Sequence, residues 1–270
     1  MEKKIFISAD IEGITDVTTW AETEVGGSGY EDACAQMTRE VSAACEAVLE
    51  AGYVPVVRDG HETATNIRHI DLPDGTELMR GWACHPGSML AGVDGSYSGV
   101  FYIGYHAPGG SNGSPLAHTI DREKIRWVKI NGKLASEFTI NSLYAASKGV
   151  PSLLITGDEM ICRMAKEEVP QMAAVAVKHG RGNSTHNLHP LEACRRIKEA
   201  AARQLEQFAK APYGPQPVPE ALVMELCLGS HQAVRSALHL PGVEKVDEFT
   251  VRCTTKDPTE FNVVREQIHH

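Results

Sequence analysis

Two carboxylates follow the first apolar run of the chain. Residues 5–9 are mostly apolar, and Asp10, Ile11, Glu12 and Gly13 come directly after them. In an extended backbone, residues two apart point to the same side, so we expect the side chains of Asp10 and Glu12 to converge. Converging carboxylates in a buried place repel each other unless a proton or a cation lies between them. The pair indicates either a metal site or, more plainly, a strand end with solvated acids.

Three histidines and a third carboxylate follow later apolar runs or lie in the loops beyond them. They are His61, His106, His118 and Glu137. Imidazoles and carboxylates without thiolates suit zinc, manganese or iron better than calcium. Five such ligands exceed what one tetrahedral zinc takes, so two metal ions that share a carboxylate fit the number better. A sixth group could then move protons or stabilise an oxyanion.

Two further acids and one loop near these positions each have two interpretations. Asp59 either orients His61 or caps a turn. Asp158 is either another ligand at a strand end or the N-cap of the helix that follows. The glycine-rich segment 109–115 is either a mobile lid or an ordinary surface loop.

The apolar pattern predicts an α/β fold with a mostly parallel central sheet flanked by helices. Short apolar runs alternate with segments whose apolar residues recur every three or four positions. Right-handed crossovers place the carboxyl ends of parallel strands at one edge of the sheet, which is where open α/β sheets bind ligands. The expected strands are 5–9, 53–57, 77–83, 99–105, 151–156 and 173–178, and the expected helices are 30–51, 138–148, 160–168 and 190–210. Asn131-Gly132 between apolar runs predicts a β-hairpin.

The end of the chain differs in composition from the rest. Residues 211–220 contain four prolines and are predicted to be a linker. We expect residues 1–210 to form an α/β metal-binding catalytic domain and residues 221–270 to form a small α+β domain. Within the latter, 221–227 and 249–253 are predicted strands, and 231–239 and 257–267 are predicted helices.

Composition narrows the class of protein. The 270 residues carry a formal net charge of −9, from 26 basic and 35 acidic side chains, which argues against nucleic acid as a partner. Seven scattered cysteines without a CxxC motif indicate free thiols in a reducing compartment. The charged start of the chain is unlike a signal peptide, and no apolar run is long enough to cross a membrane. A cytoplasmic location is therefore expected.

Several short motifs in order resemble the D-aminopeptidase family of the Bacillus dipeptide-transport operon, which is peptidase family M55. The motifs are SADIEGI with Asp10 and Glu12, RDGH with His61, GYHA with His106, AHT with His118, and SEFTIN with Glu137. The similarity runs from residue 4 to about residue 180. Several motifs in matching order are far more specific than any one of them.

The resemblance implies a site, a reaction and an assembly. It implies two zinc ions per chain, with Asp10 as the shared ligand and His118 as a catalytic residue. The remaining ligands would be Glu12, His61, His106 and Glu137. Members release N-terminal D-amino acids, D-Ala above all, from short peptides by attack of metal-activated water, and they form two stacked pentameric rings. The alternative is a di-metal peptidase or amidohydrolase that acts on L-residues or other small amides.

Overall fold

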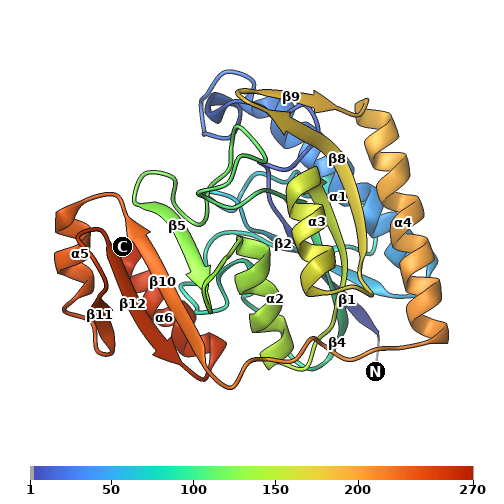
Figure 1. Ribbon diagram of the computed structural model, residues 1–270. Coiled ribbons are helices and arrows are strands. Elements are labelled where there is room, and N and C mark those ends of the chain that lie inside the picture. Colours follow the sequence, from blue (N-terminus) through green and yellow to red (C-terminus); the bar gives the residue numbers. More distant parts are fainter. Residues whose placement is uncertain (1–2, 270) are drawn as a thin grey trace.

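The computed structural model describes residues 3–269, with a seven-stranded sheet at its centre (Figure 1). The strand order is β3-β2-β1-β4-β7-β8-β9, and every neighbouring pair is parallel except β8 and β9. Near-continuous burial of β1, β4 and β7 explains why their sequences are apolar throughout. The strands are β1 Lys4–Ala9, β2 Val54–Asp59, β3 Glu77–Met79, β4 Tyr97–Tyr105, β7 Ser152–Asp158, β8 Ala173–Arg181 and β9 Ser184–Asn187.

Helices cover both faces of this sheet (Figure 1). The helices α1 (Tyr30–Glu50) and α4 (Pro190–Lys210) pack against each other and share one hydrophobic core with β1. The helices α2 (Glu137–Ser147) and α3 (Glu159–Glu168) contribute to a second core on the other face. The predicted α/β class with a mostly parallel, helix-flanked sheet is confirmed. None of the helices in the described part of the chain has the length and apolar character of a membrane span.

A second, antiparallel sheet combines strands from two distant parts of the sequence. Its order is β11-β12-β10-β5-β6. The bounds are β5 Ile125–Ile130, β6 Lys133–Leu134, β10 Leu222–Leu228, β11 Val243–Lys245 and β12 Thr250–Thr255, and the helices α5 (His231–Ala237) and α6 (Pro258–His269) pack on it. The predicted hairpin is present, with both Asn131 and Gly132 at positive φ. Because β5 pairs with β10, the sheet spans both predicted domains, and their division at 211–220 stays a prediction.

Polar strands account for the main differences between the sequence analysis and the structure. Strand β8 continues to Arg181 and returns as β9, which has no apolar residue in its sequence. Strand β3 ends at Met79 rather than at residue 83, and the short β11 was not predicted. Three 3-10 helices, at Trp20–Glu22, His69–Asp71 and Ser88–Leu90, lie within predicted loops or weakly patterned segments.

Three glycines let the carboxyl ends of β1, β4 and β7 approach one another. The Gly13 amide donates to the Gly104 carbonyl at 2.8 Å, and a Cβ on Gly13 would lie 1.9 Å from the Tyr105 carbonyl oxygen. Gly104 has φ +74°, and its Cβ would lie 2.2 Å from the Asp10 carbonyl oxygen. A Cβ on Gly157 would lie 1.8 Å from the Tyr105 carbonyl oxygen. These contacts bring the residues that follow β1 alongside those that follow β4.

Candidate metal centre

The six predicted site residues gather at the carboxyl edge of the large sheet. Each comes from a connection that follows a strand or begins a helix. Asp10 and Glu12 follow β1, His61 follows β2, and His106 follows β4. His118 lies in the loop before β5, and Glu137 is the first residue of α2, whose N-cap is Ser136. Parallel strand direction therefore explains most of the convergence.

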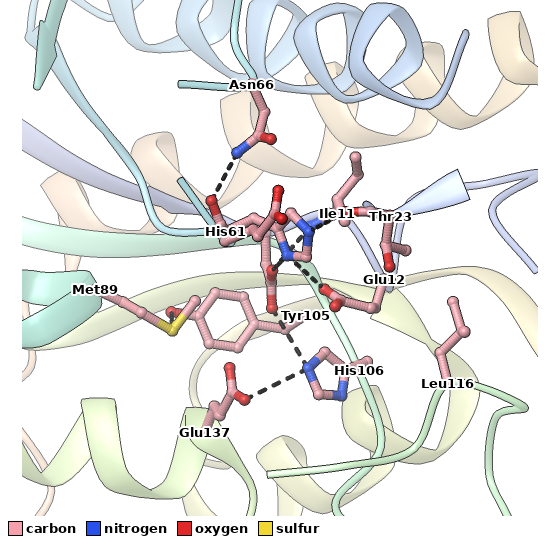
Figure 2. Close-up of polar contacts among 12 residues, drawn as sticks. Ile11, Glu12, Thr23, His61, Asn66, Met89, Tyr105, His106, Leu116 and Glu137 are labelled. Carbon is pink, nitrogen blue, oxygen red and sulfur yellow. Dashed lines mark hydrogen bonds and ion pairs between the residues drawn. The ribbon is translucent and has the colours of Figure 1, made fainter. Parts of the chain in front are cut away.

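Asp10 lies between two groups of side chains, each containing a histidine and a glutamate. Its Oδ1 is 3.3 Å from His61 Nδ1, which is 3.1 Å from Glu12 Oε2. We call Asp10 Oδ1, Glu12 Oε2 and His61 Nδ1 the His61 half-site. Asp10 Oδ2 is 3.4 Å from His106 Nε2, which is 3.7 Å from Glu137 Oε1. These three atoms form the His106 half-site, and Figure 2 shows the contacts of His61 with Glu12 and of His106 with Glu137.

The separations within the half-sites suit metal coordination. Two ligand atoms bound to one tetrahedral zinc at ~2.0–2.1 Å are ~3.3 Å apart. The four nitrogen–oxygen separations range from 3.1 to 3.7 Å. Each half-site therefore has room for a small cation between its ligand atoms, with Asp10 reaching both.

His118 lies beside both half-sites. Its Nε2 is 3.8 Å from Glu137 Oε1 and 3.9 Å from Glu12 Oε1. Its ring stacks on His106 at 4.2 Å between centroids and makes a T-shaped contact with Trp20 at 5.2 Å. Metal-sized clusters form from Asp10, Glu12 and His106, and from His106, His118 and Glu137. The geometry therefore suits His118 as a ligand as well as a catalytic residue, and its role stays a prediction.

Backbone carbonyls determine which nitrogen of each histidine faces the carboxylates. His61 Nε2 lies 2.7 Å from the Thr23 carbonyl, His106 Nδ1 3.0 Å from that of Ala107, and His118 Nδ1 2.9 Å from that of Leu116. A carbonyl only accepts, so each of these nitrogens carries the hydrogen. In a neutral ring the other nitrogen then carries a lone pair that points at carboxylate oxygens. Such an arrangement calls for a cation between them.

Burial and charge oppose each other at these residues. Burial, then the Glu12 carboxylate, raises the pKa of Asp10. Burial would also raise the pKa of Glu12, but His61 holds it well below its usual value. Against the same burial effect, His106 lowers the pKa of Glu137 to about 2. Burial would lower the pKa values of His61 and His106, yet the neighbouring carboxylates raise both well above the usual range. The fold thus brings three buried carboxylates together, and their negative charge favours a cation or protonated histidines beside them.

Three buried atoms of the half-sites have no hydrogen-bond partner within the described residues. They are Asp10 Oδ2, Glu12 Oε2 and His106 Nε2. A buried polar atom without a partner is costly, and one metal ion in each half-site would satisfy these atoms. The donor set of carboxylate oxygens and imidazole nitrogens is one that zinc accepts. The residues present therefore fit two metal ions.

Asp158 and Asp59 hold the backbone next to two of the histidines. Asp158 caps α3, because its Oδ1 accepts from the Ile161 amide at 2.9 Å, and its Oδ2 accepts from the Ala107 amide at 2.6 Å. It thereby fixes the backbone next to His106 and stands outside the metal-sized clusters. Asp59 accepts from Asn66 Nδ2 and the Ile67 amide, each at 2.8 Å, so it organises the turn after His61.

A cavity of about 1030 Å³ opens over the site and is lined by five of the six residues, all except His106. Its wall includes three side chains that the sequence analysis did not single out, Trp20, Trp82 and Asn141. Asn141 follows Glu137 by four positions on α2, a spacing that places both on one helix face and could have identified it. Trp20 and Trp82 lie in segments without periodicity, so sequence gives no comparable signal. The 109–115 segment packs on β8, where the Gly180 amide donates to the Gly113 carbonyl at 3.2 Å.

A parallel α/β sheet with buried carboxylates and imidazoles at its carboxyl edge, beneath an open cavity, is typical of metal-dependent hydrolases. Comparison with known proteins agrees with this class and refines it. Residues 3–265 match the Peptidase M55 family, described as D-aminopeptidase, and the chain belongs to this family.

Two known proteins illustrate the similarity. A D-aminopeptidase from Bacillus subtilis (strain 168) is 28% identical over 260 residues, covering 95% of this chain and 93% of the relative. The structure of the Zn-dependent D-aminopeptidase DppA from Bacillus subtilis, described as a self-compartmentalizing protease, superposes with a TM-score of 0.91. It is 25% identical, and the match covers 98% of this chain and 96% of that one. The similarity therefore includes the small antiparallel sheet as well as the central one.

Proposed function

We propose that this protein is a zinc-dependent aminopeptidase that releases N-terminal D-amino acids, D-Ala-like ones in particular, from short peptides. The observation that carries the proposal is the position of Asp10, whose two oxygens lie 3.3 and 3.4 Å from histidines of separate half-sites. Membership of family M55 and the similarity to a Zn-dependent D-aminopeptidase support zinc and the D-residue.

Five side chains would hold two zinc ions per chain. Asp10 would be shared, with Glu12 and His61 on one side and His106 and Glu137 on the other. Bound zinc supplies Lewis acidity at a carbonyl and lowers the pKa of water. Glu137 is kept in place by the Ile120 amide, which donates to its Oε1 at 2.7 Å. The backbone contacts at Thr23 and Ala107 hold the two histidine rings in the orientation that a ligand needs.

His118 would act on protons or on the developing oxyanion. Its Nδ1 is occupied by the Leu116 carbonyl, so Nε2 is the atom that faces the reaction centre. In the neutral ring Nε2 can accept a proton, and in the protonated ring it can donate a hydrogen bond to a negatively charged oxygen. Packing between His106 and Trp20 limits rotation of the ring and so keeps Nε2 in place.

The cellular setting forms part of the proposal. We place the protein in the cytoplasm as a ring decamer of two stacked pentamers. All seven cysteines are free thiols, five of them buried, which suits a reducing compartment. The self-compartmentalizing relative supports assembly into a closed particle.

The deciding experiment compares D-Ala and L-Ala p-nitroanilides with protein of measured zinc content, with and without a chelator. Chelator-sensitive release from the D form alone, at about two zinc ions per chain, is the expected result. Release from the L form would favour the alternative, a di-metal peptidase or amidohydrolase for L-residues or other small amides. Absence of release from both forms at full metal loading would contradict the proposed activity.

A further inference from the structure

A chain of hydrogen bonds runs beneath the candidate metal centre, and its Tyr105 hydroxyl has two acceptors within reach, Ser8 Oγ at 2.7 Å and Met89 Sδ at 3.8 Å. Ser8 Oγ donates to the Met89 carbonyl at 3.1 Å. Because its hydrogen is used there, Ser8 Oγ accepts from Tyr105 Oη at 2.7 Å. Tyr105 Oη in turn accepts from Asn141 Nδ2 at 2.9 Å. Ser8 and Tyr105 are fully buried, so water does not offer their hydroxyl groups other partners.

This chain fixes the orientation of the Asn141 amide. An amide has two N–H donors and one carbonyl acceptor, and Tyr105 can serve Asn141 only as an acceptor. The second N–H of Asn141 points at Met89 Sδ, 3.3 Å away. Figure 2 shows Tyr105 and the Met89 sulfur side by side near Glu137. Both donors are therefore used inside the protein, and the carbonyl oxygen Oδ1 is the remaining polar atom.

That oxygen has no donor among the described residues. It makes no hydrogen bond to them, and it is not one of their buried atoms without a partner. Asn141 lines the cavity, although only 3% of its surface is exposed. It lies one helical turn after Glu137, on the same side of α2. Oδ1 is thus the polar atom of Asn141 that remains available to a group in the cavity beside the candidate metal centre.

We propose that Asn141 Oδ1 binds the free α-amino group of the substrate and so contributes to selection of an unblocked N-terminus. This inference rests on the proposed aminopeptidase function and names a residue for its substrate specificity. An ammonium group carries three donors and no acceptor, so it complements a fixed carbonyl oxygen. Acids on the cavity wall, among them Glu137 and Glu62, favour a cation in this cavity, whereas Glu24 on the same wall is paired with Arg122.

The test measures binding of two zinc-directed probes to the zinc-loaded full-length protein by calorimetry. D-alanine hydroxamate carries the α-amino group, and propionohydroxamate is the same molecule without it. In Asn141→Leu we expect the dissociation constant of D-alanine hydroxamate to rise by about 10- to 100-fold, as for loss of a hydrogen bond to a charged group. The constant for propionohydroxamate should change by less than about threefold, because its contacts are retained.

Two variants separate recognition from structural damage. Asn141→Asp keeps an acceptor at this position and should retain the preference for the amino-bearing probe. Tyr105→Phe keeps Asn141 but removes the group that orients its amide, so the preference should fall. Thermal unfolding and zinc content are measured for each protein.

The result that overturns the inference is equal weakening of both probes in Asn141→Leu, or equal affinity for both in the wild type. Either outcome would leave Asn141 as a residue that only supports the fold. The proposed function is checked separately, by wild-type turnover of the D-Ala anilide. A protein that binds the probes with the expected preference but hydrolyses only the L form would support this inference and contradict D-specificity.

Discussion

Each histidine of the candidate site is held through one nitrogen so that the other faces the centre. The partners are main-chain carbonyls of Thr23, Ala107 and Leu116, which are present whatever side chain those positions carry. A backbone acceptor fixes the ring orientation without adding another charge to a site that already holds three carboxylates. Substitution at these three positions is therefore expected to affect the rings less than movement of their backbone would.

Removal of the His118 ring should separate chemistry from metal binding. In His118→Ala we expect the rate to fall by at least about 100-fold, since proton transfer and oxyanion stabilisation are typically worth this much. Zinc content should remain near that of the wild type, because the five proposed ligands are untouched. The checks are kcat and metal analysis, with the exposed His239→Ala as a control. A variant with near-normal turnover, or one that loses an ion, would contradict the proposed role.

The buried carboxyl group of Glu40 should make the stability of the wild type depend on pH in a way that Glu40→Gln does not. Its side chain is fully buried on α1, and burial raises its pKa to about 7 from the ordinary 4.5. Between pH 4.5 and pH 7 the folded state therefore retains a proton that the unfolded state releases. The contribution of Glu40 to the free energy of unfolding is intact below pH 4.5 and is lost as pH rises through 7. We expect Glu40→Gln to gain stability relative to the wild type between pH 5 and pH 8, by up to about 3 kcal/mol.

The comparison uses denaturant unfolding of both proteins at fixed zinc concentration. Because each protein contains the same proposed ligands, their titration cancels in the difference. Glu40 Oε1 accepts from the Thr15 amide at 3.1 Å and from Gln36 Nε2 at 3.2 Å, and the amide oxygen of glutamine can accept from both. A difference that stays constant over this pH range would show that Glu40 is charged in the folded protein.

At the scale of the elements, close approach of strand ends determines the geometry of the site. Gly104 has positive φ and lies against the backbone of Asp10. We expect Gly104→Ala to lower the free energy of unfolding by about 2–4 kcal/mol, from overpacking and an unfavourable backbone conformation. It should also reduce zinc content, because β4 must move away from Asp10.

The matched control is Gly214→Ala, at an exposed position with ordinary φ and no atom within 4 Å of an added Cβ. It should change stability by less than about 0.5 kcal/mol. Equal effects of the two substitutions would show that contact at Gly104 is unimportant. Chemical unfolding measures the free energy of unfolding of both variants, and metal analysis measures their zinc content.

The elements also show what sequence pattern can and cannot predict. Strands β1, β4 and β7 were predictable because buried parallel strands are apolar throughout. The six polar site residues stood out because most directly follow such a run or begin a helix. Strand β9 was not predictable, since its Thr185 pairs with Thr18 and its Asn187 with the Asp16 amide rather than with an apolar core. The two half-sites likewise depend on which oxygen of Asp10 faces which ring, and this follows only from the assembled fold.

At the scale of the whole molecule, the proposed ions would tie three connections of the sheet, those after β1, β2 and β4, to α2. Ligand binding to the folded state alone stabilises it, by about 4 kcal/mol at a free concentration 1,000 times the dissociation constant. We therefore expect a chelator to lower the melting temperature, and zinc to restore it. Calorimetric scans of chelated and reloaded protein measure this. An unchanged melting temperature after verified metal removal would contradict coupling between the ions and the fold.

The pairing of β5 with β10 has a consequence for the order of events during synthesis. His118 and Glu137 flank the β5–β6 hairpin, and one edge of β5 pairs with residues 224–228, about one hundred positions later in the sequence. A nascent chain that has just passed Glu137 carries all six polar side chains, but its hairpin has no partner strand. The ribosome must finish most of the remaining sequence before this support exists. We therefore expect chains that end before β10 to carry His118 and Glu137 without the strand pairing that supports the hairpin between them.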